Sequence, residues 1–302
     1  AIIGAGRTRF TEHWEEDPKT MIGLAGMKAL ESVDKGIRRK DIEAGYFGSF
    51  LYQVTNKIGL VPGYMSRELG LNVPMINTEA ACASGGLALH NACLGIESGR
   101  YDAILVAGFE KMSDRQDKII DDLMFAADPH EFEAGYNFPG LYATMMTRYM
   151  YEFGKDDPKC AEALAQISSK NHHHCIKNKY AQFKDKGEIS VEDVLNSRMI
   201  ANPIRILHSS PISDGAVALI MTKPEIAKKY TDTPIYIMSS QEVTDHVSLY
   251  TRNKITSVMA TRLAVKQALK ETGLTIDDID IAEAHDCFSI EEAFFLEDSG
   301  FY

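Results

Sequence analysis

The chain has 302 residues, a formal net charge of −11 at pH 7, and 45 % hydrophobic and 25 % charged residues. This length can bury one large core or two ordinary ones, and the composition excludes a disordered chain. The acidic charge, without any run of Lys and Arg, excludes generic nucleic-acid binding and means that an anionic ligand would need a local cluster of donors.

Strand-like apolar runs alternate with helical patterns along the first third of the chain. This alternation predicts an α/β fold whose strands are mostly parallel. Ordered from the N-terminus, the expected elements are a strand at 1–4, a helix at 20–33, strands at 42–50 and 74–78, a helix at 81–98 and a buried strand at 103–108.

The stretch from about 110 to 205 is richer in helical and polar patterns, and we interpret it as an insertion that could act as a lid. The α/β alternation then resumes to the end of the chain. We expect strands at 216–222 and 234–239, a helix in which Ile255, Met259 and Leu263 recur at four-residue spacing, a strand at 279–284 and a helix from Ser289.

A weak internal repeat divides the chain into two similar halves. Residues 25–48 align without gaps on 264–287 with six identities. Amphipathic helices share composition, so chance is the alternative explanation. A true repeat would place the counterpart of residue 82 beyond Tyr302, so we expect the chain to stop inside its second half. The predicted domains are 1–230, with the insertion at about 110–205, and 231–302, a truncated start of the second half.

The five cysteines and the apolar runs bear on the compartment. The cysteines are irregularly spaced without a CxxC pair, so we expect a reducing cytoplasm, no disulfide framework and no metal site. Apolar runs stay below the ~18 residues of a membrane helix, so no membrane association is expected. Because Ala1 lies inside an apparent strand, we expect further residues before it.

Cys82 lies where a predicted strand ends and a helix begins, in the segment 77–86. Peptide dipoles and N–H groups at a helix start stabilise a thiolate and can hold the oxyanion formed when a thioester is attacked. An unpaired cysteine is more often a small core residue, so spacing alone leaves both interpretations open.

His285 lies at the carboxyl end of the predicted strand 279–284, the sheet edge where ligand chemistry gathers in α/β proteins. A histidine there can donate a hydrogen bond to a thioester carbonyl, with the neighbouring Asp286 fixing its tautomer. The alternative is an ordinary core or surface histidine.

Four segments together carry a resemblance. AACASGG (80–86), GFEKMSD (108–114), SSPISDGA (209–216) and AEAHDCF (282–288) occur in the order found in thiolases. The whole chain resembles the thiolase superfamily, and within it the branch of archaeal acetoacetyl-CoA thiolases and sterol-carrier-protein thiolases, which carries His-Asp-Cys-Phe.

The resemblance implies a five-layer αβαβα thiolase fold built from two similar βαβαβαββ halves, the second incomplete in this chain. It also implies that a helical insertion covers coenzyme A, which matches 110–205. Cys82 would be the acyl-accepting nucleophile, His285 would help form an oxyanion hole, and Ser210 would contact the pantetheine arm of coenzyme A. The implied reaction makes or cleaves a 3-oxoacyl-CoA, with coenzyme A and acyl-CoA as substrates and no permanently bound cofactor.

The resemblance also implies partners. Thiolases assemble as homodimers or dimers of dimers. Some members of this branch associate with a small zinc-containing, OB-fold acyl-CoA-binding protein, and others with hydroxymethylglutaryl-CoA synthase.

The chain departs from the thiolase pattern at its end. A Gly-His-Pro motif and a second cysteine motif would follow Tyr302, so we expect roughly another hundred residues, on this chain or a second one. Cys287 belongs to the His-Asp-Cys-Phe motif and is not taken as that second cysteine. Two alternatives remain: a thiolase-like subunit for aldol cleavage of a CoA thioester, which the intact Cys82 disfavours, and a non-catalytic scaffold subunit, which the missing motifs would favour.

Three further patterns are expected to be structural. Gly4-Ala5-Gly6 resembles a dinucleotide fingerprint, but Arg9 occupies the third glycine position. Residues 172–175, three histidines and a cysteine, point about 100° apart on a helix and are expected to form a solvated face. Glu110-Lys111 and Asp114-Arg115 are expected to be surface charges.

Overall fold

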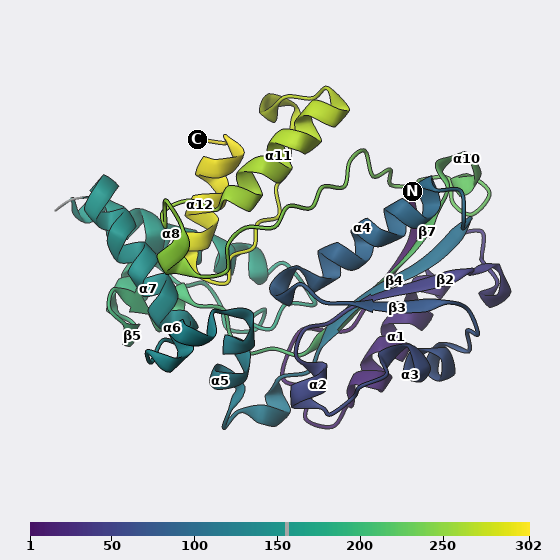
Figure 1. The fold of residues 1–302 in the computed structure, drawn as a ribbon, viewed down its shortest axis with the longest axis horizontal. Coiled ribbons are helices and arrows are strands. Elements are labelled where there is room, and N and C mark those ends of the chain that lie inside the picture. Colours follow the sequence, from purple (N-terminus) through teal and green to yellow (C-terminus); the bar gives the residue numbers. More distant parts are fainter. Residues whose placement is uncertain (155–156) are drawn as a thin grey trace. The chain divides into compact units, whose positions relative to one another are not determined.

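The computed structural model describes residues 1–154 and 157–302 (Figure 1). The chain forms two compact units, each made from two separate stretches. The first unit contains 1–122 and 212–240, and the second contains 123–211 and 241–302. Compact units and repeat halves are defined differently, so the predicted domain boundary at residue 230 stays a prediction.

The first unit is built on a five-stranded sheet with the order β1-β7-β4-β2-β3 (Figure 1). Strand β2 is parallel to β3 and β4, whereas β7 runs antiparallel to both of its neighbours, β1 and β4. Every strand except β7 therefore runs in one direction, which agrees with the mostly parallel sheet predicted from the sequence. The strands are β1 (Ile2–Arg7), β2 (Ala44–Gly48), β3 (Met75–Thr78), β4 (Ala103–Glu110) and β7 (Gly215–Thr222).

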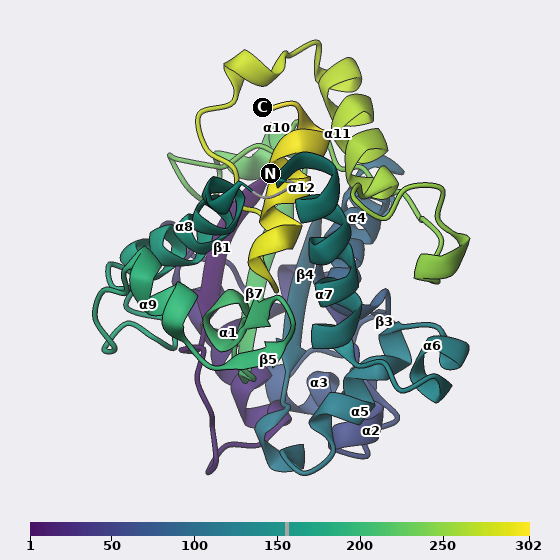
Figure 2. The same cartoon turned by 90° about the vertical axis from the view of Figure 1, so that its left-hand side faces the viewer.

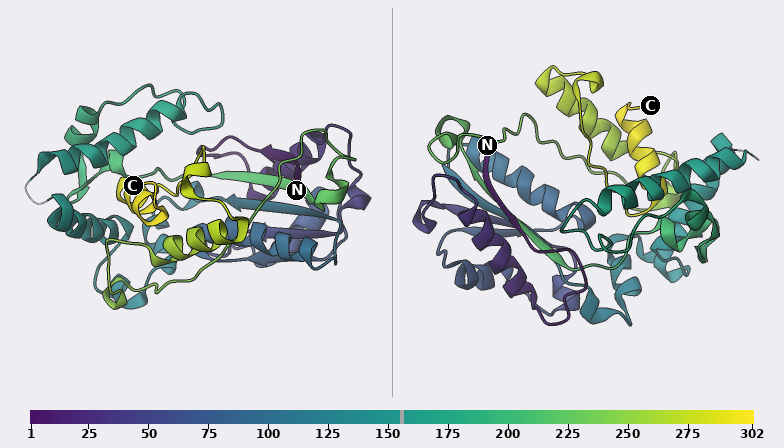
Figure 3. Two further views of the ribbon diagram at one scale, coloured as in Figure 1. Left: turned by 90° about the horizontal axis from the view of Figure 1, so that it is seen from above. Right: turned by 180° about the vertical axis from the view of Figure 1, so that it is seen from behind.

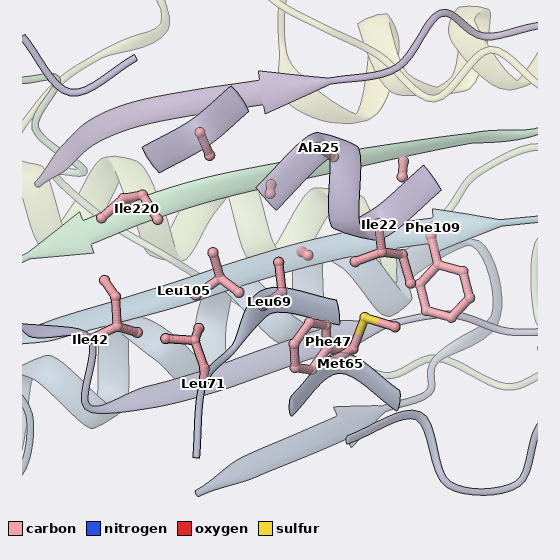
Figure 4. Close-up of a cluster of buried hydrophobic side chains, with 14 of the residues drawn as sticks. Ile22, Ala25, Ile42, Phe47, Met65, Leu69, Leu71, Leu105, Phe109 and Ile220 are labelled. Carbon is pink, nitrogen blue, oxygen red and sulfur yellow. The ribbon is translucent and has the colours of Figure 1, made fainter. Parts of the chain in front are cut away.

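Helices cover both faces of this sheet, α1 and α3 on one face and α4 on the other (Figures 1 and 3). Alternation along β4 explains why both faces are needed: Leu105 packs into the α1 side, whereas Ile104 and Val106 pack against α4. Figure 4 shows the core on the α1 side. The helices of the unit are α1 (Pro18–Glu31), α2 (Tyr52–Thr55), α3 (Val61–Leu69), α4 (Ser84–Glu97), α5 (Ile119–Leu123, at its end) and α10 (Pro224–Ala227).

Gly4 and Gly6 let β1 approach α1 closely. A Cβ at Gly6 would lie 2.2 Å from the carbonyl oxygen of Ala25, and one at Gly4 would lie 2.6 Å from that of Ala29. Any larger residue would push strand and helix apart. The glycines at 4–6 therefore serve packing, in agreement with the structural interpretation of this pattern.

The second unit is mainly helical. Helix α12 is flanked by α7 and α8, and α11 packs against α12 (Figure 2). Its core contains Met146, Leu164, Phe288 and Phe294. Its elements are α6 (Pro129–Glu133), α7 (Phe138–Tyr149), a π-helical turn (Met150–Gly154), α8 (Pro158–Cys175), α9 (Val191–Asn196), the hairpin β5 (Met199–Ala201) and β6 (Ile204–Arg205), α11 (Met259–Thr272) and α12 (Ser289–Ser299). Within the described ranges, no helix has the length and apolar character required to cross a membrane.

Two predicted strands are wrong for this structure. The segment 234–239 forms only an isolated bridge between Ile235 and Ile2, and 279–284 has no regular secondary structure. Strand patterns need a neighbouring strand to pair with, and among the described residues 279–284 has none. Ile281 is accordingly 80 % exposed. The second central sheet of the expected five-layer fold is thus not formed in the described part of the chain.

The predicted repeat is matched in its first two elements. The unit from α1 through the 3₁₀ turn Arg39–Asp41 corresponds in order to α11 and the 3₁₀ turn Ile276–Asp278. In the first copy strand β2 follows, whereas in the second copy the following segment is unpaired. The predicted helix containing Ile255 begins later than expected, at Met259.

Candidate active site

Cys82 lies in a 3₁₀ turn, Ala81–Ala83, between β3 and α4. The parallel strands β2, β3 and β4 end at the same edge of the sheet, and the turn follows directly from that edge. The Cys82 side chain is exposed. The sequence prediction of a cysteine between strand end and helix start is therefore correct.

The backbone before Cys82 is strained. Ala81 has φ of 48°, a left-handed conformation that residues with a Cβ seldom adopt. Ser84 holds this turn: its hydroxyl donates to the Ala81 carbonyl at 2.7 Å and accepts from the Ala80 N–H at 2.9 Å. The Glu79 carboxylate accepts from the Ala81 N–H at 2.6 Å. This sharp turn keeps the thiol exposed ahead of the helix.

The first turn of α4 packs directly on the strand ends. A Cβ at Gly48 would lie 2.2 Å from the Ser84 carbonyl oxygen, and one at Gly108 would meet the Gly85 Cα at 3.7 Å. A Cβ on Gly85 or Gly86, by contrast, would meet no described atom outside its own helix within 4 Å. The close packing therefore depends on Gly48, at the end of β2, which the sequence analysis did not identify.

His285 and Ser210 both lie in the second unit, whereas Cys82 lies in the first. The backbone N–H of Ser210 donates to the Cys287 carbonyl at 2.9 Å, and Ser209 forms a bridge with Phe288. The structure therefore brings Ser210 next to the segment that carries His285, although the two motifs are 75 residues apart in the sequence.

The His285 side chain is accessible to solvent, yet the protein around it lowers its pKa through desolvation, and the Asp286 carboxylate only partly offsets this. The imidazole is therefore uncharged at neutral pH, with one N–H donor and one acceptor nitrogen. This protonation state suits a hydrogen-bond donor to a developing oxyanion.

A cavity of about 240 Å³ lies beside Ser210, between α8 and the segments around 207–211 and 286–289. Ser210 and Asp286, one from each motif, line it together with Asn171 and His172 of α8. Sequence reasoning did not predict His208, which also lines the cavity. It is buried, and its Nδ1 lies 2.7 Å from the Ser289 hydroxyl. Burial, together with the charge of Arg205, lowers its pKa to about 4.

The three consecutive histidines point in different directions. His172 is half-buried, stacks on Phe183 and lines the cavity, so the predicted solvated face is wrong for this residue. His173 and His174 are exposed, and His173 pairs with Glu188 at 2.7 Å. In residues 1–154 and 157–302, no group of three or more His, Cys, Asp or Glu side chains could hold a metal ion.

Lys111 is buried, so its predicted place on the surface is wrong. Its ammonium donates to Asp214 at 3.0 Å, to Asp114 at 2.8 Å and to the Ser113 hydroxyl at 2.6 Å. Asp214 is fully buried and also accepts from the backbone N–H groups of Met112 and Ser113. Burial alone would raise the pKa of Asp214, but these hydrogen bonds keep it below its usual value.

Comparison with known proteins shows the family of this chain. Residues 1–151 match the family model "Thiolase, N-terminal domain", and residues 241–302 match "Thiolase C-terminal domain-like". The chain belongs to the thiolase family.

This thiolase is similar to two proteins named acetyl-CoA acetyltransferase. The one from Methanothermobacter thermautotrophicus is 40 % identical over 100 % of this chain and 77 % of its own length. The one from Methanocaldococcus jannaschii is 42 % identical over 100 % of this chain and 76 % of its own.

A solved structure described as an Ltp2-ChsH2(DUF35) aldolase matches this thiolase with a TM-score of 0.85 and 21 % identity, over 100 % of this chain and 77 % of that one. At this identity the likeness concerns the fold, and it confirms the thiolase fold predicted from the sequence. The two family models and the acetyltransferase relatives make this protein an acyltransferase of the thiolase type.

Proposed function

We propose that this thiolase makes or cleaves a 3-oxoacyl-CoA through an acyl group carried on Cys82. The observation that carries the proposal is the exposed thiol on a strained turn, directly before helix α4 and at the edge where the parallel strands end. A helix start supplies a positive dipole end, which favours a thiolate and the oxyanion that forms beside it.

In the cleavage direction, the Cys82 sulfur attacks the 3-oxo carbon of the substrate. The bond between C2 and C3 then breaks, and its electron pair leaves as the enolate of acetyl-CoA, which takes up a proton. Coenzyme A next attacks the acyl-cysteine thioester, and the Cys82 thiolate leaves. Covalent transfer divides one difficult exchange into two easier steps. Synthesis runs the same steps in reverse.

We assign His285 to the thioester oxygen of the enolate. Its uncharged imidazole supports this role, because the N–H of a neutral ring donates one hydrogen bond to the oxyanion and keeps its proton. Ser210 is proposed to contact the pantetheine arm, and its place beside the 240 Å³ cavity supports this. Coenzyme A thus enters as a substrate, and no resident cofactor is required.

The identities of 40 % and 42 % to acetyl-CoA acetyltransferases support acetyl-CoA and acetoacetyl-CoA as the substrates. A cytoplasmic location is proposed because the five cysteines are irregularly spaced and lack the pattern of a disulfide framework. The proposed assembly is a homodimer or dimer of dimers, with a zinc-containing OB-fold acyl-CoA-binding protein or hydroxymethylglutaryl-CoA synthase as further partner. Light scattering of the purified protein, alone and with each candidate, tests the assembly.

Incubating the protein with radiolabelled acetyl-CoA and quenching in acid tests the function. One label per chain is expected, stable to acid, released by hydroxylamine and absent from the Cys82→Ser variant. Cys160→Ser is the matched control, because Cys160 is a cysteine of another element, helix α8 of the second unit, and this variant should retain the label. Equal labelling of Cys82→Ser and the wild type would refute the proposal.

A further inference from the structure

The side-chain amide of Asn171, on helix α8, bridges two carboxylates. Its Nδ2 lies 2.6 Å from Oδ2 of Asp286 and 2.8 Å from Oε2 of Glu292. An amide nitrogen carries two hydrogens, so each carboxylate receives one. Glu292 is buried and also pairs with Lys170, the residue before Asn171. The amide therefore links α8 at once to α12 and to the segment that precedes it.

This link matters because the described backbone that leads up to His285 has no regular secondary structure. Residues 279–286 form no helix or strand, so no ladder of backbone hydrogen bonds fixes them. On the C-terminal side of His285, the hydrogen bond from the Ser210 N–H to the Cys287 carbonyl holds the chain. Between His285 and Cys287, the side chain of Asp286 accepts a hydrogen bond from Asn171. The residue directly after His285 is therefore held by a side chain, the Asn171 amide.

The charges around the link explain why an amide suits this position. Asp286 and Glu292 are both acidic, and Lys170 compensates Glu292. The Asp286 charge also raises the pKa of both His172 and His285, against the larger effect of desolvation, which lowers them. A neutral donor at 171 satisfies both carboxylates without adding charge. A carboxylate there would place three negative groups together.

We infer that Asn171 is a positioning residue for the reaction: its amide holds Asp286, and through it the adjacent His285, in the geometry that stabilises the substrate oxyanion. The inference rests on the proposed function for the role of His285. The structural part, that Asn171 controls the surroundings of the His285 ring, stands on the contacts alone.

The isosteric variant Asn171→Asp, in the full-length protein, tests this most sharply. It replaces both donors by a carboxylate and pushes Asp286 away from α8. Displacement of a catalytic group by about 1 Å can cost up to about a hundredfold in rate. We therefore expect kcat to fall about ten- to a hundredfold, with KM for coenzyme A changed by less than about threefold. Gln166→Glu is the matched control, since Gln166 is an exposed amide on the same helix.

A titration of selectively labelled histidine by NMR supplies a readout that does not depend on activity. The His285 signal is assigned with His285→Ala. Because Asp286 is freed and a negative charge is added, Asn171→Asp should raise the pKa of His285, and Gln166→Glu should leave it unchanged. An unmoved His285 pKa in Asn171→Asp would overturn the inference. Asn171→Ala, which loses both donors without gaining charge, replaces Asn171→Asp if that variant has a lower melting temperature than wild type by more than a few degrees.

Asp286→Asn and the double variant complete the test. If Asn171 acts through Asp286, the two changes are not additive, and the double variant is no slower than the worse single variant. The inference fails if the rate losses of the two single variants multiply in the double variant. It also fails if Glu292→Gln alone reproduces the loss while Asp286→Asn keeps full activity, because Asn171 would then act through helix packing. A normal kcat in His285→Ala, together with a shifted His285 pKa in Asn171→Asp, would instead refute the proposed function and leave the contact intact.

Discussion

At the scale of single residues, His285 offers a direct test of the proposed oxyanion role. Its ring is uncharged at neutral pH, so replacing it removes a hydrogen-bond donor and no charge. Loss of one such donor typically costs ~10² to 10³ in rate. His285→Ala should therefore lower kcat by that factor and leave coenzyme A affinity nearly unchanged.

Two further variants make the His285 measurement specific. His285→Asn keeps an N–H donor near the same place and should retain more activity than the alanine variant. His130→Ala changes an exposed histidine of the second unit, which pairs with Glu133 on the surface, and should leave kcat unchanged. A kcat of His285→Ala equal to wild type, by steady-state thiolysis, would contradict the role.

His208 predicts a pH dependence of stability. Its pKa in the folded protein is about 4, below the ordinary 6.5, because burial disfavours the charged ring. Between these values the unfolded chain binds the proton and the folded chain does not, so stability falls as pH drops from about 6.5 to 4. At about 1.4 kcal/mol per pKa unit, the loss is at most about 3 kcal/mol.

His208→Asn should flatten this dependence, because asparagine can still reach the Ser289 hydroxyl but does not titrate. Urea denaturation at pH 7, 6, 5 and 4 measures it. His246→Asn, an exposed histidine, is the control and should keep the wild-type slope. An identical slope in His208→Asn and wild type would show that His208 is not the titrating group.

Among the elements, the turn between β3 and α4 depends on glycine at the end of a different strand. Gly48→Ala would place a methyl group 2.2 Å from the Ser84 carbonyl, so the first turn of α4 must shift. We expect a loss of about 1–3 kcal/mol in unfolding free energy and slower alkylation of Cys82 by iodoacetamide. Gly59→Ala is the control, since nothing described lies within 4 Å of the added Cβ. Unchanged Cys82 alkylation in Gly48→Ala would mean that the packing does not govern the thiol.

The sequence alone was enough to predict the place of Cys82, but not the roles of Ser84 and Asn171. A cysteine between a strand and a helix is a local pattern, and so is the predicted helix at 81–98. Ser84 was missed because its function depends on two backbone atoms of a strained turn, which no pattern displays. Asn171 was missed because its partner Asp286 lies 115 residues away. The strand predicted at 279–284 failed for a related reason: alternation shows that a segment can form a strand, but pairing decides whether it does.

At the scale of the whole molecule, the side chains around Asp214 connect segments that are far apart in the sequence. The chain leaves the first unit after Asp122 and returns at Ile212. Asp214 accepts hydrogen bonds from the end of the outgoing segment, through Lys111 and Ser113, and from the His13 N–H at 2.8 Å. Lys111 is 1 % exposed and also lies over the Trp14 ring. One carboxylate therefore joins three distant parts of the sequence.

Asp214→Asn should destabilise the protein strongly. It leaves the buried Lys111 charge without its buried partner, and removing one member of such a pair costs about 3–5 kcal/mol. Asp114→Asn removes the other carboxylate near Lys111, but this side chain is 43 % exposed. That loss should stay within about 1 kcal/mol. Equal unfolding free energies for the two variants, from chemical denaturation, would contradict the assignment.

The contacts of Asp214 also suggest where part of this thiolase can be exchanged for that of a homologue. The outgoing strand β4 and the returning strand β7 pair along their whole length, from Ala103 opposite Thr222 to Glu110 opposite Gly215, and Asp214 fastens the end of this pair. We therefore expect the sheet that carries Cys82 to form with different chains between them. Loop-closure entropy rises only slowly with length, so segments of quite different size could join the same two points. A chimera that takes residues 115–211 from a homologue and keeps Lys111, Ser113 and Asp214 should therefore retain a folded nucleophile turn, which the rate of Cys82 alkylation by iodoacetamide would report.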